Sequence, residues 1–247
     1  MSLGQHLVEL RKRLFRSAIA ILLGAVAGWF LYSWVWPQLQ GPITQVAKTH
    51  KATINFTNIT GAFDVHMQIA ITIGLVISSP VWLYQIFAFL VPGLTSREKR
   101  YVFGFVFSAI PLFLAGCAAG WYVFPHIVEL MASFVPAQSA SFYDAKYYLD
   151  FVLKLVLVVG VAFVLPVFIV LLNFIGILSA KAILKGWRWA ILAIVVFTAI
   201  ATPAADIASM MLLALPMVFL YFASLGVAAL HDRSVARRAP SVVTAGV

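Results

Sequence analysis

The feature that most constrains this chain is a series of long apolar stretches, each bounded by polar or basic residues. A helix that crosses the ~30 Å hydrocarbon core of a bilayer needs about 20 mostly apolar residues. Six stretches are candidates, and they cover residues 15–36, 65–91, 101–124, 147–175, 187–201 and 206–230. The fifth stretch is short, so we expect the bilayer to thin locally or polar groups to sit deep there.

The composition has too few charges for a soluble protein. Only 10% of the 247 residues are charged and 63% are hydrophobic, whereas a soluble domain carries about 25% charged residues. So few charges cannot cover a water-facing surface, and lipid must therefore cover much of it. The sequence predicts an all-α integral membrane protein with six transmembrane helices.

Most basic residues are predicted to lie on one side of the membrane. Thirteen of the 17 Lys and Arg residues flank the apolar stretches on that side: Arg11, Lys12, Arg13, Arg16, Arg97, Lys99, Arg100, Lys181, Lys185, Arg188, Arg233, Arg237 and Arg238. The positive-inside rule then places both termini in the cytoplasm. The outer side receives a long loop at 37–64, a medium loop at 125–146 and a short turn before Asp206.

Four of the predicted spans contain an internal proline: Pro80, Pro111, Pro166 and Pro216. Proline removes one backbone hydrogen bond and bends a helix. We expect the bent helices to pack side by side into a curved, concave wall.

The N-terminal residues predict a separate amphipathic helix. Leu3, Leu7, Leu10 and Leu14 recur at helical spacing between charged residues, a pattern typical of a helix lying on the membrane surface. The predicted domain organisation is an amphipathic cytoplasmic helix at 1–14, a transmembrane domain at 15–230 and a polar cytoplasmic tail at 231–247.

Motifs of enzymes, metal sites and nucleotide sites are absent from the sequence. It contains no phosphate-binding Gly-rich loop with Lys-Ser/Thr, no H-E-x-x-H and no G-x-S-x-G. The five His residues lack ligand spacing, and the single Cys117 excludes an intrachain disulfide. The net charge of +9 is explained by cytoplasmic loops rather than by nucleic-acid binding. We predict a protein that is not an enzyme and has no metal, cofactor or nucleic-acid partner.

Two of the eight acidic residues lie inside basic clusters. Glu98 follows Thr95 by three positions, which forms a capping box at the start of the third span. Glu9 precedes Arg13 by four positions, so the two side chains can pair on one helix face. Neither structural role prevents a carboxylate at the membrane surface from also accepting hydrogen bonds from a ligand.

Three more ionisable residues lie within or near the predicted membrane, where charge is costly. Asp150 and Lys154 have the i,i+4 spacing of a helical ion pair, which favours mutual neutralisation near the outer interface. Asp206 begins the sixth span, where a carboxylate suits the positive end of the helix dipole.

Several stretches together resemble one family. They are "HLVELRKRL" at 6–14, "SPVWLYQIFAFLVPGLTSREKR" at 79–100, "YVFP" at 122–125, "YYLDF" at 147–151, "LPVFIVLLNFIGILS" at 165–179 and "ATPAADIASMMLLALPM" at 201–217. In their order and in their placement relative to six spans, they resemble TatC, the multispanning subunit of the twin-arginine protein translocase. The topology expected from charge agrees with that family independently.

The resemblance implies a signal-peptide receptor and core translocase subunit in the bacterial cell membrane. Such proteins recognise signal peptides that carry two adjacent arginines on folded precursors, and transport uses the proton-motive force. The partners it implies are single-span subunits of the TatA and TatB type, membrane lipids and further copies of the chain within a hetero-oligomeric complex.

The resemblance also implies the binding residues. Glu98 would be the main acceptor for an arginine and Glu9 would take the other, because arginine pairs with carboxylates bidentately. Nearby bases could keep both carboxylates ionised and reject excess positive charge; they are Arg11, Arg13, Lys99 and Arg100. Leu10 and Leu14 could receive the hydrophobic part of the signal peptide.

Further polar residues implied to function in the membrane region are Tyr84, Gln85 and Asp206. One position departs from the family pattern, because Val164 in "FVLP" stands where many members carry an acid before the proline of the fourth span. We therefore expect no acidic site there.

The alternative function is that of a secondary transporter or channel for a small solute. Such proteins commonly show repeated halves and paired broken helices, which the sequence lacks. An intramembrane protease lacks support because no catalytic set is present.

Overall fold

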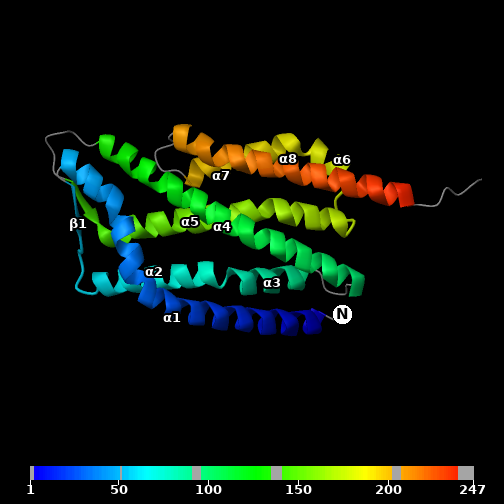
Figure 1. Ribbon diagram of the computed structural model, residues 1–247, viewed down its shortest axis with the longest axis horizontal. Helices are drawn as coiled ribbons and strands as arrows, with labels where there is room; N and C mark the ends of the chain where they lie inside the picture. Colours follow the sequence, from blue (N-terminus) through cyan, green and yellow to red (C-terminus); the bar gives the residue numbers. More distant parts are fainter. Residues whose placement is uncertain (1–2, 51, 91–95, 135–140, 202–206, 239–247) are drawn as a thin grey trace, which may run out of the picture.

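The computed structural model describes residues 3–50, 52–90, 96–134, 141–201 and 207–238, and it is almost entirely helical (Figure 1). In chain order the elements are α1 (Leu3–His50), β1 (Ala52–Asn55), α2 (Gly61–Ile77), α3 (Ser79–Leu90), α4 (Ser96–Ser133), β2 (Ser141–Asp144), α5 (Ala145–Phe174), α6 (Ala180–Lys185), α7 (Trp187–Ala201) and α8 (Ile207–Arg238).

The long helices run alongside one another in three groups. Figure 1 shows α1, α2 and α3 along one edge, α4 and α5 in the middle, and α6, α7 and α8 along the other edge. Helices α2 and α3 are separated by a break at Ser78 and meet at an angle of 59°. Pro80 is the second residue of α3, directly after this break.

The membrane-spanning prediction agrees with the structure in its coarser form. Four helical segments in the described ranges are long and apolar enough to cross a bilayer, and the bent α2–α3 pair makes five if it counts as one span. Helix α7 has the predicted bounds but only 15 residues, and by length it is not counted among them. The number six therefore stays a prediction.

The first predicted outer loop is largely helical, which corrects the prediction for residues 37–64. Helix α1 continues through Pro37 and Pro42 to His50. Its extension is stabilised by Leu39, Ile43 and Val46, which lie one turn apart and are at most 5% exposed. This burial offsets the hydrogen bonds that the two prolines remove.

Two further helices also extend past their predicted ends. Helix α4 runs through Pro125 to Ser133, with Ile127 and Ala132 buried in the core, so the first part of the predicted 125–146 loop is helical. Helix α8 continues to Arg238, eight residues past the predicted boundary at 230. At the N-terminus, residues 3–14 are helical as predicted, but they continue into α1 without a break.

A small parallel ribbon that the sequence analysis does not predict joins the two predicted outer loops. Strand β1 pairs with β2 in the register Ile54 opposite Tyr143. The Thr57 hydroxyl donates to Asp144, which also caps the N-terminus of α5 by accepting from the backbone N–H groups of Tyr147 and Lys146. These bonds, with that from Thr57 foremost, hold the pKa of the Asp144 carboxyl below its ordinary value.

Glycines allow two helix pairs to approach closely. A Cβ atom on Gly24 of α1 would lie 2.6 Å from the backbone oxygen of Gly74 in α2. A Cβ atom on Gly116 of α4 would lie 2.8 Å from the Cα atom of Gly160 in α5. Larger residues would separate these backbones, as expected for membrane helices that pack through small residues.

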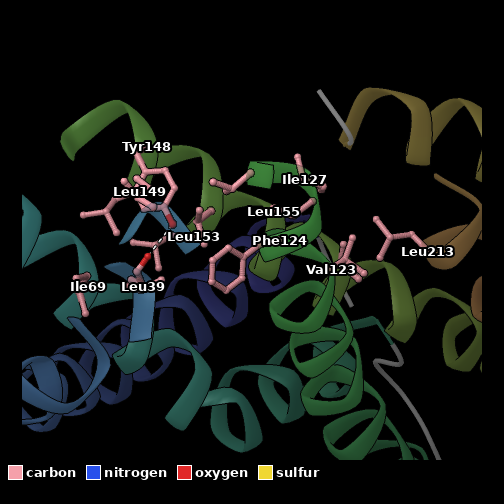
Figure 2. Packing of buried hydrophobic residues seen from close by; sticks show 14 of the residues in the cluster. Leu39, Ile69, Val123, Phe124, Ile127, Tyr148, Leu149, Leu153, Leu155 and Leu213 are labelled. Carbon is pink, nitrogen blue, oxygen red and sulfur yellow. Dashed lines mark hydrogen bonds between the residues drawn. The ribbon is translucent and has the colours of Figure 1, made fainter. Parts of the chain in front are cut away.

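The main hydrophobic core lies where α1, α4 and α5 meet. Figure 2 shows Phe124 of α4 among Leu39 of α1 and Leu153 and Leu155 of α5. The Tyr148 hydroxyl donates to the Leu39 backbone oxygen at 2.7 Å, drawn as a dashed line, within this buried cluster. The bond ties α1, between its two prolines, to α5.

Candidate functional site

The candidate site lies where the first turns of α1 approach α3. His6 stacks on Phe89 with ring centroids 4.4 Å apart, which fixes the start of α1 against the end of α3. Figure 1 shows the start of α4 at this same end of the molecule. The structure thus brings residues 6–14 and the first turns of α4, at 96–100, to one end.

Glu9 and Arg13 form an ion pair on α1, as their spacing predicts. Both Nε and Nη2 of Arg13 donate to Oε1 of Glu9, at 3.0 Å and 2.6 Å. Only 24% of the Glu9 side chain and 21% of the Arg13 side chain are exposed. The pair is therefore shielded from water more than a typical surface salt bridge, which strengthens it.

A third side chain joins this pair from another helix. Gln85 of α3 is 8% exposed, and its Oε1 accepts a hydrogen bond from Arg13 Nη1 at 3.2 Å. Gln85 is predicted as a functional residue only from the family resemblance. A buried glutamine in an apolar helix is a signal that it needs a partner, but the identity of the partner is not readable from sequence.

The second carboxylate oxygen of Glu9 has no partner among the described residues. Oε2 is buried and makes no hydrogen bond to any described residue. Burial of a carboxylate oxygen without a donor costs free energy, and an incoming N–H group would remove that cost. Glu9 therefore keeps one carboxylate oxygen that no described donor satisfies.

The other predicted site residues are placed as follows. Arg11 is exposed, and so are Leu10 and Leu14, at 39% and 67%. Tyr84 is half-buried in α3. Glu98, Lys99 and Arg100 belong to the first turns of α4, but their side chains lie outside what the structure describes, as do Thr95 and Asp206. The predicted capping box is therefore not tested.

At the opposite end of the molecule, Asp150 and Lys154 form the predicted ion pair, with 2.5 Å between Lys154 Nζ and Asp150 Oδ2. Gln68 of α2 donates to the other oxygen of Asp150 at 3.0 Å, a contact across 82 residues that sequence reasoning missed. Near it, Lys146 pairs with Asp64 at 3.0 Å. The acids and bases here neutralise one another.

The sequence also did not predict a polar cluster between α5, α6 and α8. Asn173 is 2% exposed and donates to Asp232 at 2.9 Å, while Asp232 accepts from the first backbone N–H of α6 at 2.8 Å. His231 stacks on Phe174 and lies 3.2 Å from the Asn173 oxygen. The signal in sequence is Asp232 itself, a scarce acid next to the last apolar stretch, which the prediction assigned to a polar tail.

Val164 fits an apolar environment, in line with the expectation of no acidic site there. It is 2% exposed in a cluster with Leu83 of α3 and Phe113 of α4. An apolar cavity of about 240 Å³ lies one turn away between α4, α5 and α8, beside Pro166 and Val167. In the part of the chain that is described, no three His, Cys, Asp or Glu side chains are grouped for a metal ion.

Comparison with known proteins gives a consistent result. The family model described as "Sec-independent protein translocase protein (TatC)" matches residues 5–216. The chain is 46% identical over 240 residues to the Sec-independent protein translocase protein TatC of Xylanimonas cellulosilytica, covering 96% of this chain and 87% of that protein. It is 33% identical over 223 residues to TatCy of Bacillus subtilis, covering 90% and 86% respectively.

A solved structure matches over a similar length. A crystal structure of the twin arginine translocase receptor TatC aligns with a TM-score of 0.74 and 29% sequence identity, covering 92% of this chain and all of that chain. Helix order, length and sequence thus agree with one family, and this chain belongs to the TatC family of Sec-independent protein translocase proteins.

Proposed function

We propose that this protein is the signal-peptide receptor and core subunit of a twin-arginine translocase, which moves folded precursors across the membrane. The observation that carries the proposal is the family match over residues 5–216, and the described relatives bear the same translocase name. A carboxylate with an unoccupied, buried oxygen at the end of α1 supports it chemically. The role is transport and not catalysis.

Recognition of an arginine pair rests on two carboxylates. Glu9 offers Oε2 to one guanidinium and Glu98 receives the other, and each bond is charge-assisted. The bases around them limit the total positive charge that binds and keep the carboxylates ionised; they are Arg11, Arg13, Lys99 and Arg100.

The hydrophobic part of the signal peptide packs along the exposed leucines of α1. Leu10 and Leu14 are on the same helix as Glu9, within two turns of it, and are both exposed. Burying them against the peptide adds hydrophobic free energy to the charge-assisted bonds. The same helix thus contacts both the arginine and the apolar segments of one ligand.

The membrane arrangement proposed is six spans with both termini in the cytoplasm of a bacterial cell. The basic residues supply the orientation, and α7 supplies the short fifth span. Bent helices, including the 59° α2–α3 pair, would then form a concave wall. Asp206 and Tyr84 are proposed as polar functional positions of this wall.

The proposed partners are TatA- and TatB-type single-span subunits, membrane lipids and other copies of this chain, with transport driven by the proton-motive force. No cofactor or nucleic acid takes part. A transporter of small solutes is the alternative function, and no contact in the described residues favours it.

Site-specific photo-crosslinking tests the receptor role. A photoreactive amino acid at position 10, beside Glu9 and with both carboxylates intact, should crosslink to a twin-arginine signal peptide, and should not crosslink to a twin-lysine version. Position 30 is the matched control, since Phe30 is 76% exposed on the same helix and lies about 30 Å away at ~1.5 Å per residue. Equal crosslinking from positions 10 and 30 would refute the proposed site.

A further inference from the structure

Three polar side chains form a connected chain from α3 to the candidate acceptor. Gln85 accepts from Arg13 Nη1 at 3.2 Å, and Arg13 donates from Nε and Nη2 to Glu9 Oε1 at 3.0 Å and 2.6 Å. The guanidinium of Arg13 is thus shared between two helices whose bonded residues, 13 and 85, are 72 positions apart. All three side chains lie at one end of α1.

The geometry fixes which carboxylate oxygen is available. Both bonds from Arg13 end on Oε1, and Oε2 stays buried without a partner among the described residues. An i,i+4 pair on a single helix is a weak restraint, because long side chains lose entropy when they are held in one geometry. Gln85 adds a restraint from a second helix and is itself only 8% exposed, so it has little freedom to move.

We propose that Gln85 and Arg13 are positioning residues for signal-peptide recognition: Gln85 fixes Arg13, and Arg13 fixes Glu9 so that Oε2 is left to accept from the incoming arginine. The inference rests on the proposed function, in which Glu9 binds an arginine of the signal peptide. It adds a role for two residues that do not themselves contact the ligand.

This arrangement favours arginine over lysine. With both bonds from Arg13 on Oε1, the ligand binds Glu9 through the single oxygen Oε2. A guanidinium presents several N–H groups in one plane and can direct two of them at a fixed oxygen, whereas an ammonium group binds as a point charge with freely rotating donors. A fixed Oε2 therefore discriminates more strongly than a carboxylate that can rotate.

A double-mutant cycle on the full-length protein in lipid nanodiscs tests the inference. The measured quantity is the Kd of a fluorescent twin-arginine signal peptide, and of its twin-lysine version, for Gln85→Leu, Glu9→Gln and the double variant. We expect Gln85→Leu to weaken twin-arginine binding roughly three- to tenfold, which is the size of one hydrogen bond, and to reduce the preference for arginine. In the Glu9→Gln background, the same change should have no further effect.

Two further variants separate positioning from packing. Gln85→Glu keeps an acceptor oxygen and should retain most of the twin-arginine peptide binding that Gln85→Leu loses. Leu83→Ala is the control, since Leu83 is 2% exposed on the same helix but carries no polar contact, and its effect should be the same with Glu9 or Gln at position 9. If Gln85→Leu does not accumulate in the membrane, Arg13→Lys enters the same cycle, because it keeps the charge and loses the planar fork.

The outcomes distinguish the inference from the proposed function. If Gln85→Leu or Arg13→Lys weakens binding equally in both backgrounds, or not at all, the positioning role is wrong while Glu9 remains the acceptor. If Glu9→Gln binds the peptide as tightly as the native protein, the receptor role of Glu9 fails, and the inference fails with it.

Discussion

At the scale of single residues, the chemistry of this protein depends on a few acids in a basic, apolar chain. Glu9 and Asp150 are each paired with a base four positions further on, yet their surroundings differ. Among the described residues, Glu9 has one buried oxygen without a donor, whereas Asp150 uses one oxygen for Lys154 and the other for Gln68. One oxygen of the first acid therefore lacks the donor that both oxygens of the second have.

Glu98 provides a test of recognition against capping. Glu98→Ala should weaken binding of a twin-arginine peptide by about 2–5 kcal/mol, the cost of removing one partner of a desolvated charge pair. Glu98→Gln retains the capping box, because glutamine also serves at that position. If Glu98 binds an arginine, Gln should lose affinity almost as Ala does in an equilibrium peptide-binding assay. Native affinity in Glu98→Gln would leave capping as the whole role of this residue.

The Asp150–Lys154 pair should be structural and carry no transport chemistry. Asp150→Asn removes the partner of Lys154 and should lower the amount of protein in the membrane, though modestly, because Lys154 is 70% exposed and long enough to reach the interface. The double variant Asp150→Asn with Lys154→Met should recover both abundance and export of a twin-arginine reporter. Gln68→Leu is the matched control, because it removes only the hydrogen bond from the neutral Gln68 to Asp150. A double variant that is abundant but inactive would show that the pair has a functional role.

At the scale of helices and strands, two helix ends that were predicted at prolines are wrong, and the reason is physical. The predicted loops at 37–64 and 125–146 begin at Pro37 and Pro125, yet α1 and α4 continue through both. The helices persist because Leu39 and Ile127 lie in the core at 0% exposure, and sequence alone does not reveal this long-range burial. By contrast, the bounds of α5 and α7 were predicted to within two residues from continuous apolar runs.

The side-chain contacts that the sequence did not predict join segments that are distant along the chain. Gln85 to Arg13, Gln68 to Asp150 and Asn173 to Asp232 each join residues more than 50 positions apart. Local spacing predicted the Glu9–Arg13 and Asp150–Lys154 pairs, because helix geometry places i and i+4 on one face. It cannot indicate which helix packs beside them.

The β1–β2 ribbon should be sensitive to acid. The pKa of Asp144 is lowered by the Thr57 hydroxyl and by backbone N–H groups, so the ionised carboxylate stabilises the fold. This contribution is present above the ordinary carboxyl pKa and is lost as the pH falls through the lower value of the folded protein. Hydrogen exchange of the amides at 52–55 should therefore accelerate at acidic pH, and Asp144→Asn should remove much of that dependence. An unchanged pH profile in Asp144→Asn would contradict this assignment.

At the scale of the whole molecule, the proposed orientation can be measured directly. Ile59 is fully exposed after β1, and Ser234 is exposed near the end of α8. In a background with Cys117→Ala, Ile59→Cys should react with a membrane-impermeant thiol reagent on intact cells, and Ser234→Cys should react only after the membrane is opened. Cys117 itself is buried, so its removal controls for background labelling. Reversed or equal labelling would overturn the proposed topology.

Helix α1 is held firmly in the core at one end and by few contacts at the other. At its far end α1 is buried in the core through Leu39 and Ile43, and near its middle Gly24 packs closely against Gly74 of α2, whereas its N-terminal end contacts α3 through the His6–Phe89 stack and the Arg13–Gln85 bond. The N-terminal arm from Leu3 to Gly24 is about 30 Å long at ~1.5 Å per residue, so a small rotation near Gly24 becomes a displacement of a few ångströms at Glu9. Electron paramagnetic resonance measures the distribution of distances between spin labels at positions 8 and 86. This distribution should therefore become broader in Gln85→Leu and narrower when a signal peptide binds. A distribution that neither change alters would mean that the arm is rigid without its end contact.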